Sequence, residues 1–364
     1  MTKTKEELLA ILGQFPLEGN AVAAEPFGNG HINDTLKVTT DDGQVKYILQ
    51  RINHQIFTNV DMLQQNIHVV TTHIRRKLEA KGETDIDRKV LTFLPTRAGK
   101  LYHFDGENYW RVCLMIPRSR SYEEVTAEKS YEAGLAFGEF QAMLADIPEG
   151  TLGETIPNFH NMEFRLEQFR EAVAADRAGR LAEVADLVEA IEQRAQDMCI
   201  QEVLYRDGRL RKRVNHCDTK VNNILFDEQG KVLCVIDLDT VMPGFVLSDI
   251  GDFIRTGANT GAEDDPNLEK VGVNLPIFEA YTRGYMEKAQ AFLTPLEISM
   301  LPYGGRLLTY MQTVRFLTDY INGDTYYKIH YPEHNLVRTR AQYRLLQSLE
   351  EHAEEMINFM EQWL

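Results

Sequence analysis

This sequence contains little tryptophan and cysteine. It has no long hydrophobic run and no excess of basic residues. Only 2 Trp and 4 Cys occur among 364 residues, and Cys113, Cys199, Cys217 and Cys234 stand far apart, without the paired spacing of a metal site. We therefore expect reduced thiols and a cytoplasmic location. No segment approaches the roughly 20 apolar residues of a transmembrane helix, and the charged opening Met1–Glu7 is unlike a secretory signal.

The balance of charge excludes several partners. The chain has 39 Lys and Arg against 55 Asp and Glu, a net charge of −16. Such a field repels nucleic acid backbones and anionic membrane surfaces, so we expect neither as a partner. A composition that is 43% hydrophobic and 26% charged is that of a globular protein, and the length favours two domains.

Strand signals dominate the first part of the chain. Residues 25–39 are predicted to form two strands around a glycine-bearing turn at 27–31. Asp41–Gly43 is a hairpin signal, and residues 45–52 are rich in strand formers. A short helix over 5–14 precedes these three antiparallel strands.

One helix and two strands complete this part. Apolar residues at helical spacing predict a helix over 59–80, capped by Thr58. Apolar runs at 89–94 and 109–116 predict two further strands, and Pro117 then breaks the pattern. We place the domain boundary there, between an N-terminal part (1–116) and a mainly helical part (117–364).

The second part is mainly helical, with one short β element. Residues 224–226 and 231–236 flank a turn and predict a hairpin. The expected helices are 129–146, 162–176, 180–203, 276–290, 295–322 and 336–363.

Polar residues cluster at the two ends of the predicted hairpin. Phosphoryl transfer needs a carboxylate to hold and deprotonate the acceptor hydroxyl, and hard oxygen ligands for Mg²⁺. Asp218 suits the first role, and Asn223 and Asp237 suit the second. Lys220 is placed to stabilise the negative charge on the migrating phosphoryl group. The alternative for Asp218 is a turn carboxylate that caps its own backbone.

The stretch from His216 to Asn223 resembles the catalytic loop of the aminoglycoside phosphotransferase and choline kinase superfamily, and of the protein kinases. The resemblance implies an α+β, two-lobed protein-kinase-like fold, with a small antiparallel β-sheet N-lobe and a mainly helical C-lobe. In such a fold we expect residues 1–116 to form the N-terminal nucleotide-binding lobe and residues 117–364 to form the mainly helical catalytic and substrate-binding lobe. It also implies ATP as co-substrate, Mg²⁺, and Asp237 as metal ligand. Asp239 matches a second acidic residue of some relatives and is expected either to bind metal or to be solvated. Asp249 is expected to brace the catalytic loop, and His216 to be a packed loop residue.

Four motifs together look like the N-acetylhexosamine 1-kinase group: residues 30–35, 48–53, 218–220 and 315–320. That resemblance implies transfer of phosphate from ATP to the anomeric hydroxyl of N-acetylglucosamine or N-acetylgalactosamine. We expect the nucleotide to contact Gly28, Asn29, Gly30, Gln50 and Met115, and the sugar to contact His31, Asn33, Arg315 and Tyr326. The glycines alone are equally typical of an ordinary turn.

One departure from the kinase pattern concerns the strand lysine that pairs with a helix glutamate. The matching position is Gln50, followed by Arg51, and the helix offers amides at Gln64, Gln65 and Asn66. We expect a neutral pairing of Gln50 with a helix amide, or a role for Arg51. Two alternative functions stay open: an aminoglycoside or choline-type kinase, and a non-catalytic nucleotide-binding regulator.

Overall fold

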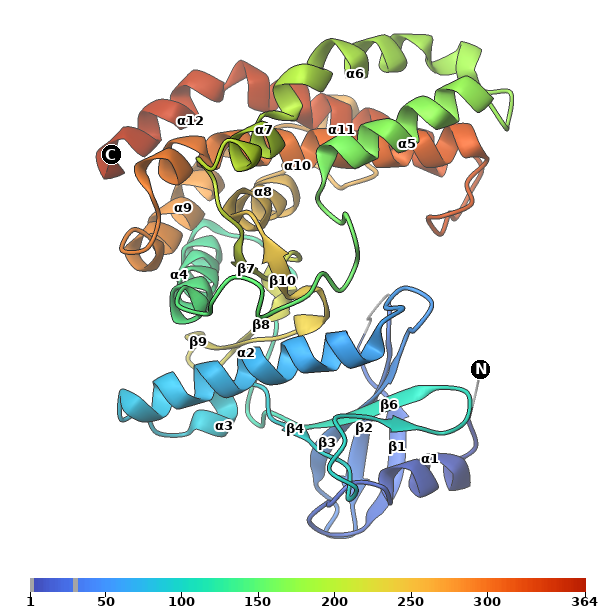
Figure 1. The fold of residues 1–364 in the computed structure, drawn as a ribbon, viewed down its shortest axis with the longest axis vertical. Helices are drawn as coiled ribbons and strands as arrows, with labels where there is room; N and C mark the ends of the chain where they lie inside the picture. Colours follow the sequence, from blue (N-terminus) through green and yellow to red (C-terminus); the bar gives the residue numbers. More distant parts are fainter. Residues whose placement is uncertain (1–2, 29–31) are drawn as a thin grey trace. The chain divides into compact units, whose positions relative to one another are not determined.

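The computed structural model describes residues 3–28 and 32–364, and the chain divides into two compact units (Figure 1). Unit 1 comprises Met1–Tyr122, Met143–Pro157 and Asn222–Pro243, and unit 2 comprises Glu123–Ala142, Asn158–Val221 and Gly244–Leu364. The expected boundary at Pro117 would divide the chain into two continuous domains. Each of the two units observed is instead built from three separate stretches of the chain. The loop after helix α4 and the predicted hairpin both cluster with unit 1.

The β-sheet of unit 1 forms as predicted. Strands β1 (Ala21–Pro26), β2 (Asp34–Thr40) and β3 (Val45–Ile52) pair antiparallel in chain order, and β6 (Tyr109–Leu114) lies beside β3. The short strands β4 (Phe93–Leu94) and β5 (His103–Phe104) both pair with β6. Gly43, at φ +77°, makes the turn between β2 and β3 because glycine adopts this region without strain.

Unit 1 also contains helices, one of which packs directly on the sheet. Helix α1 (Lys5–Leu12) packs its apolar residues against the sheet, in a core that includes Phe15, Leu49 and Val112. Helix α2 (Val60–Ala80) buries the predicted apolar residues, but Asn59 rather than Thr58 caps it. The expected strand at 89–94 is mostly wrong: residues 86–89 form helix α3 (Ile86–Lys89), and only Phe93–Leu94 pair as a strand, β4.

The hairpin predicted in the second half of the chain is confirmed. Strands β8 (Ile224–Phe226) and β9 (Val232–Val235) pair antiparallel. The 3₁₀ turns η2 (Val221–Asn223) and η3 (Leu238–Thr240) lie just outside its two strands. Strand β10 (Met242–Gly244) follows η3.

Unit 2 is mainly helical, as predicted. Its longest helix, α10 (Pro295–Asn322), contacts α5, α8 and α11 and is the centre of the core. Thr294 caps it through a capping box with Glu297, and Gly323 at φ +92° ends it. The remaining elements are α4 (Ala127–Leu144), α5 (Met162–Ala175), η1 (Leu181–Val184), α6 (Ala185–Met198), α7 (Ile200–Arg206), β7 (Arg213–Asn215), α8 (Val246–Gly257), η4 (Leu268–Lys270), α9 (Leu275–Ala289), α11 (His334–Glu351), α12 (Ala353–Met360) and η5 (Glu361–Trp363).

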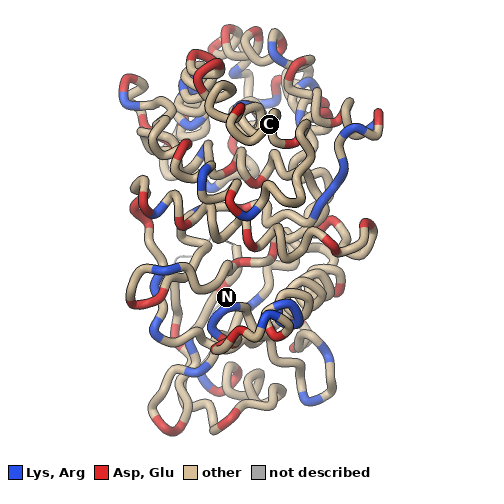
Figure 2. The backbone as a smooth tube through the Cα atoms, turned by 90° about the vertical axis from the view of Figure 1, so that its left-hand side faces the viewer, with Lys and Arg blue, Asp and Glu red and all other residues tan. Residues whose placement is uncertain are grey.

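Helix α8 is the main element that sequence patterns missed. It packs closely on α10: a Cβ on Gly251 would lie 2.3 Å from the carbonyl oxygen of Gly304, and one on Gly304 would lie 2.5 Å from that of Leu247. Both glycines are therefore required by the short distance between the two backbones. Among the described residues, no helix has the length and apolar character to cross a membrane. Acidic and basic positions are both scattered along the backbone (Figure 2).

Candidate active site

The loop between β7 and η2 carries Asp218 and Lys220 in unit 2. The Lys220 ammonium lies 2.8 Å from Asp218 Oδ1. Burial opposes the charged form of Lys220, but the neighbouring Asp218 carboxylate prevails and raises the lysine pKa. The structure thus brings together the predicted base and the predicted phosphate-stabilising cation as one ion pair.

Two buried carboxylates of α8 hold this loop. Asp249 accepts hydrogen bonds from the backbone N–H groups of His216 (2.9 Å) and Cys217 (2.7 Å), and from Gln141 Nε2 (2.7 Å). Asp252 accepts from the backbone N–H of Thr219 at 3.0 Å. Burial raises the pKa of Asp249 to about 6, against the opposing effect of these donors. The bracing role predicted for Asp249 is confirmed.

His216 is a packed loop residue, as predicted. It is fully buried, and its ring meets the edges of Phe137 and Phe140 at centroid distances of 5.4 and 5.8 Å. This packing fixes the backbone just ahead of Asp218, because the side chain has no room to move.

Asn223 and Asp237 lie at the same end of the hairpin in unit 1. Ile224 pairs with Val235, and the backbone N–H of Ile236 donates to the carbonyl of Asn223 at 2.9 Å. Asp237 adopts a left-handed conformation (φ 59°, ψ 59°), which Asp tolerates better than most residues. Side-chain oxygens from one carboxylate and one amide suit Mg²⁺, which commonly takes its other ligands from water and phosphate. Among residues 3–28 and 32–364, no cluster of three or more His, Cys, Asp or Glu could hold a metal ion by itself.

Asp239 has a partner that the sequence analysis did not anticipate. Its Oδ1 lies 2.5 Å from Arg111 Nη1, and both side chains are almost fully buried, with 4% and 3% exposed. Burial opposes the charged guanidinium, but the Asp239 carboxylate prevails and raises the pKa of Arg111. Asp239 is therefore neither solvated nor free of a cation in this structure.

Two more predicted residues join this ion pair. Asn33 Nδ2 donates to Asp239 Oδ2, and Asn33 Oδ1 accepts from the backbone N–H of Asn53 at 2.9 Å. Gln50 Oε1 accepts from Arg111 Nε at 2.9 Å, and Gln50 Nε2 donates to Thr35 Oγ1 at 3.1 Å. The residues predicted separately for nucleotide, metal and sugar thus form one network in unit 1 around Arg111.

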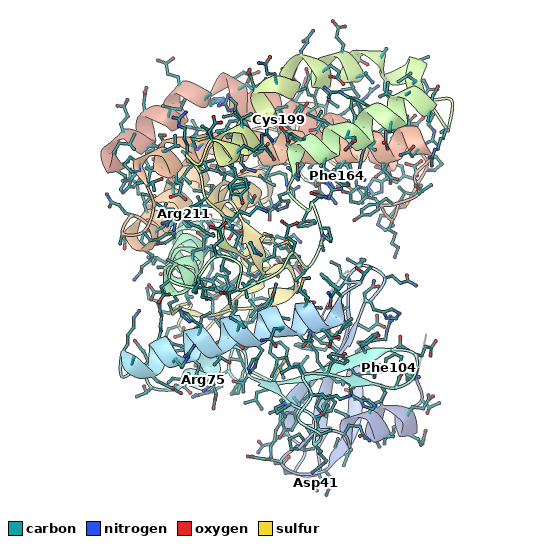
Figure 3. All side chains as sticks on the ribbon, viewed as in Figure 1. Asp41, Arg75, Phe104, Phe164, Cys199 and Arg211 are labelled. Atoms are coloured by element: carbon teal, nitrogen blue, oxygen red, sulfur yellow. The ribbon has the colours of Figure 1, made fainter. Side chains whose placement is uncertain are left out.

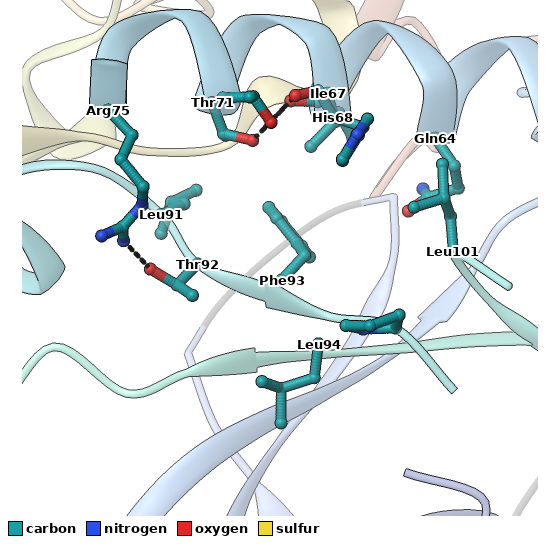
Figure 4. A pocket seen from close by; sticks show the side chains of 12 residues that line it. Gln64, Ile67, His68, Thr71, Arg75, Leu91, Thr92, Phe93, Leu94 and Leu101 are labelled. Atoms are coloured by element: carbon teal, nitrogen blue, oxygen red, sulfur yellow. Dashed lines mark hydrogen bonds between the residues drawn. The ribbon is translucent and has the colours of Figure 1, made fainter. Parts of the chain in front are cut away.

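Gln50 is hydrogen-bonded to Thr35 and Arg111, not to a helix amide. Gln64 instead lines a hollow of about 170 Å³ between α2 and residues 91–95 (Figure 4). Asn66 Nδ2 donates to the carbonyls of Gly153 (2.7 Å) and Val241 (3.0 Å), and so ties α2 to the chain that follows η3. Arg51 pairs with Asp34 at the surface of the sheet. The hypothesis of a helix-amide partner for Gln50 is wrong, because Arg111 and Thr35 occupy both ends of its side chain.

The predicted glycine turn is only partly within the described chain. Gly28 has φ +76°, and a Cβ there would meet no atom within 4 Å. Asn29, Gly30 and His31 lie outside the described residues. The backbone N–H of Met115 donates to the Lys46 carbonyl at 2.8 Å and so extends the pairing of β6 with β3. The nucleotide roles of these residues stay predictions.

Arg315 and Tyr326 line a pocket of about 300 Å³ in unit 2, between α5 and the C-terminal part of α10. Phe164 marks the beginning of α5 in Figure 3. The Arg315 guanidinium faces the Tyr326 ring at 6.0 Å, and 69% of Tyr326 is exposed. An aromatic face beside a multivalent donor is suited to holding a polar ring compound.

The sequence model of the phosphotransferase enzyme family matches residues 23–284. This chain belongs to that family. Several solved phosphotransferases have the same fold as this chain, although their sequence identity to it is low. A spectinomycin phosphotransferase, solved with ADP and spectinomycin, is 12% identical, with a TM-score of 0.60 over 98% of this chain and 100% of that one.

Two further solved relatives act on other acceptors. The ethanolamine kinase of Plasmodium vivax is 13% identical, with a TM-score of 0.52 over 88% of this chain and 81% of that one. The choline kinase LicA of Streptococcus pneumoniae is 13% identical, with a TM-score of 0.50 over 95% and 97%. The predicted α+β, protein-kinase-like fold is confirmed, with an N-terminal antiparallel sheet and a mainly helical C-terminal part.

Proposed function

We propose that this phosphotransferase is an ATP-dependent kinase for the anomeric hydroxyl of an N-acetylhexosamine, with Asp218 as the base. The observation that carries the proposal is the Asp218–Lys220 ion pair, on a loop held by two buried carboxylates. A mere nucleotide binder has little physical need for a braced carboxylate that has its own lysine. Solved relatives that bind ADP support ATP as the donor.

Asp218 would accept the proton of the sugar hydroxyl as the oxygen attacks the terminal phosphoryl group. Lys220 would orient that carboxylate and offset the negative charge on the phosphoryl oxygens. A bound Mg²⁺ supplies charge neutralisation on the phosphates, and Asn223 and Asp237 would hold it. Catalysis would then come from positioning and charge, with no covalent intermediate.

Arg315 and Tyr326 support a sugar as acceptor, because both suit a ring with several hydroxyls. The solved relatives named above act on spectinomycin, ethanolamine and choline. An amine acceptor calls for carboxylates near its cation, whereas the guanidinium of Arg315 repels one.

The test is a panel of acceptors in an assay of ADP release, run with wild type and Asp218→Asn. We expect turnover with N-acetylhexosamines, little with choline or aminoglycosides, and a kcat about 10²–10⁴-fold lower in the variant. Asp227→Asn, in the hairpin turn, is the control and should retain activity, since Asp227 only caps its own turn. Turnover of amines alone would refute the sugar acceptor. Binding of Mg-ATP without turnover of any acceptor would support a regulator instead.

A further inference from the structure

The acceptor pocket of unit 2 contains two guanidinium groups without an acidic partner. Arg165 donates from Nη1 to Gln168 Oε1 at 2.9 Å and from Nη2 to the Phe159 carbonyl at 3.1 Å. Its Nε is buried and has no hydrogen-bond partner. Arg315 donates to Gln312 Oε1 at 3.3 Å and otherwise faces aromatic rings, including that of Phe159 at 5.6 Å. All of these partners are neutral.

Both guanidinium groups belong to residues that line the same pocket. Burial and the charge of Arg315 together lower the pKa of Arg165 to about 10, and no carboxylate opposes them. Other partly buried arginines of unit 2 behave differently. Arg213 pairs with Glu297 through two bonds of 2.7 and 2.8 Å, and Arg255 pairs with Asp252 at 3.0 Å and with Glu263 at 2.6 Å. Arg165 and Arg315 are thus cations for which unit 2 supplies no counter-ion.

The acids near this pocket are already used or exposed. Both oxygens of Asp319 accept backbone N–H groups, from Thr325, Tyr326 and Tyr327 at 2.8–2.9 Å. Asp324 pairs with Arg180 at 2.6 Å. Glu171 is exposed at the rim, as is the further cation Arg177. The pocket lining therefore combines three arginines with two carboxylates, and neither carboxylate forms an ion pair with Arg165 or Arg315 among the described residues.

His160 follows Phe159, whose carbonyl accepts the bond from Arg165. Its ring stacks on Phe159 at 4.4 Å, and among the described residues its buried Nδ1 has no hydrogen-bond partner. Burial, followed by the charges of Arg315, Arg165 and Arg255, lowers its pKa to about 3, while Asp218 acts in the opposite direction. His160 is accordingly neutral at pH 7 and supplies no counter-charge to the arginines.

We propose that Arg165 and Arg315 form an oxyanion subsite, and that the acceptor is an acidic sugar with a carboxylate or sulfate remote from the reacting hydroxyl. This inference rests on the proposed function and narrows its substrate class. An oxyanion would neutralise both guanidinium groups, because their hydrogen-bond partners on the protein are neutral and a charge-assisted bond is stronger than these. An ammonium group in the same position would add a third cation, so amino sugars with a free amine are disfavoured.

The experiment compares three acceptors that share the same reacting hydroxyl: a neutral N-acetylhexosamine, its 6-sulfate, and the hexosamine with a free ammonium. We expect kcat/KM for the sulfate to exceed that for the neutral sugar by about 10-fold or more, as charge-assisted hydrogen bonds imply. The ammonium sugar should be the poorest acceptor. Calorimetric titration of the wild type with the sulfated sugar, without nucleotide, should show binding that weakens as salt rises.

Variants then assign the preference to the pair. Arg165→Gln should reduce the ratio of sulfated to neutral turnover by about 10-fold, and Arg165→Lys, which keeps the charge without the fork, should restore part of it. Arg170→Gln is the matched control on α5, because Arg170 is exposed and already paired with Glu192. It should leave the ratio unchanged.

The outcomes separate this inference from the proposed function. Equal turnover of neutral and sulfated sugars by the wild type would overturn the oxyanion subsite and leave the sugar kinase standing. An unchanged ratio in a folded Arg165→Gln protein would overturn it also. If no sugar is phosphorylated while choline or an aminoglycoside is, the proposed function fails and the subsite with it.

Discussion

Replacing Arg111 by methionine removes the cation from the buried pair with Asp239 while keeping most of the side-chain volume. Asp239 would then be a buried carboxylate with Asn33 as its remaining partner. Breaking a buried ion pair on one side costs about 3–5 kcal/mol, because the other charge is left uncompensated. If unit 1 melts as a cooperative unit of roughly 160 residues, that loss corresponds to a fall in Tm of about 6–20 °C.

Thermal unfolding by circular dichroism, with and without Mg-ATP, measures this effect. The matched control is Arg51→Met, since Arg51 pairs with Asp34 at an exposed position, where ion pairs contribute about 0–1 kcal/mol. A double variant, Arg111→Met with Asp239→Leu, removes both charges. It should be destabilised less than the sum of its two single variants, with a coupling of about 0.5–3 kcal/mol.

Turnover by Arg111→Met should also be lower than that of wild type at temperatures where the variant is folded. Asp237 lies two positions before Asp239, so loss of the anchor at Asp239 should lower kcat more than it raises the KM for the nucleotide. If the free energy of unfolding of Arg111→Met lies within about 1 kcal/mol of the wild-type value, as we expect for Arg51→Met, then the Arg111–Asp239 pair does not stabilise unit 1.

Two further predictions concern unit 2. Burial raises the pKa of Glu202 to about 7 from 4.5, so the folded protein keeps a proton there that the unfolded chain has released, and stability from this group falls as pH rises between these values. Glu202→Gln should remove this pH dependence, which amounts to roughly 3 kcal/mol of unfolding free energy at about 1.4 kcal/mol per pH unit. Measuring Tm of both proteins from pH 4.5 to 8 tests this, and an equal slope of Tm against pH in both would contradict it. Gly134→Ala should destabilise by about 3 kcal/mol or more in urea unfolding, because its Cβ would lie 2.1 Å from the Tyr281 carbonyl oxygen, whereas Gly13→Ala, with 3.3 Å to its nearest atom, should change little.

Local sequence patterns predicted the loop from His216 to Asn223 and the hairpin that follows it. The loop from His216 to Asn223 has a spacing typical of kinases, and the apolar runs on either side of residues 227–230 predicted β8 and β9 correctly. These features depend on residues near one another in the chain, where turn chemistry and periodicity carry most of the information. The division into units depends on distant contacts, and so residues 143–157 could not be assigned to unit 1 from sequence.

Arg111 could have been found. It is the one charged residue in the apolar run 109–116, and an arginine in a buried strand needs a counter-ion. The identity of that counter-ion was not readable, because Asp239 lies on the far side of the chain's midpoint and only the fold brings the two together. Helix α8 was missed for a different reason: it is short, and its two glycines, Gly251 and Gly257, have low helix propensity.

The missing strand lysine does not by itself argue for a protein that has lost catalysis. In the kinase pattern, a lysine and a helix glutamate join the sheet to the helix beside it. Here the cation is Arg111 on β6, its carboxylate is Asp239, and Gln50 connects the pair to β3. Asn66 makes the link from α2 through the Val241 carbonyl. Sheet and helix are therefore both tied to the segment that follows Asp237, the predicted metal ligand, and a buried charge pair, which costs desolvation, is retained beside it.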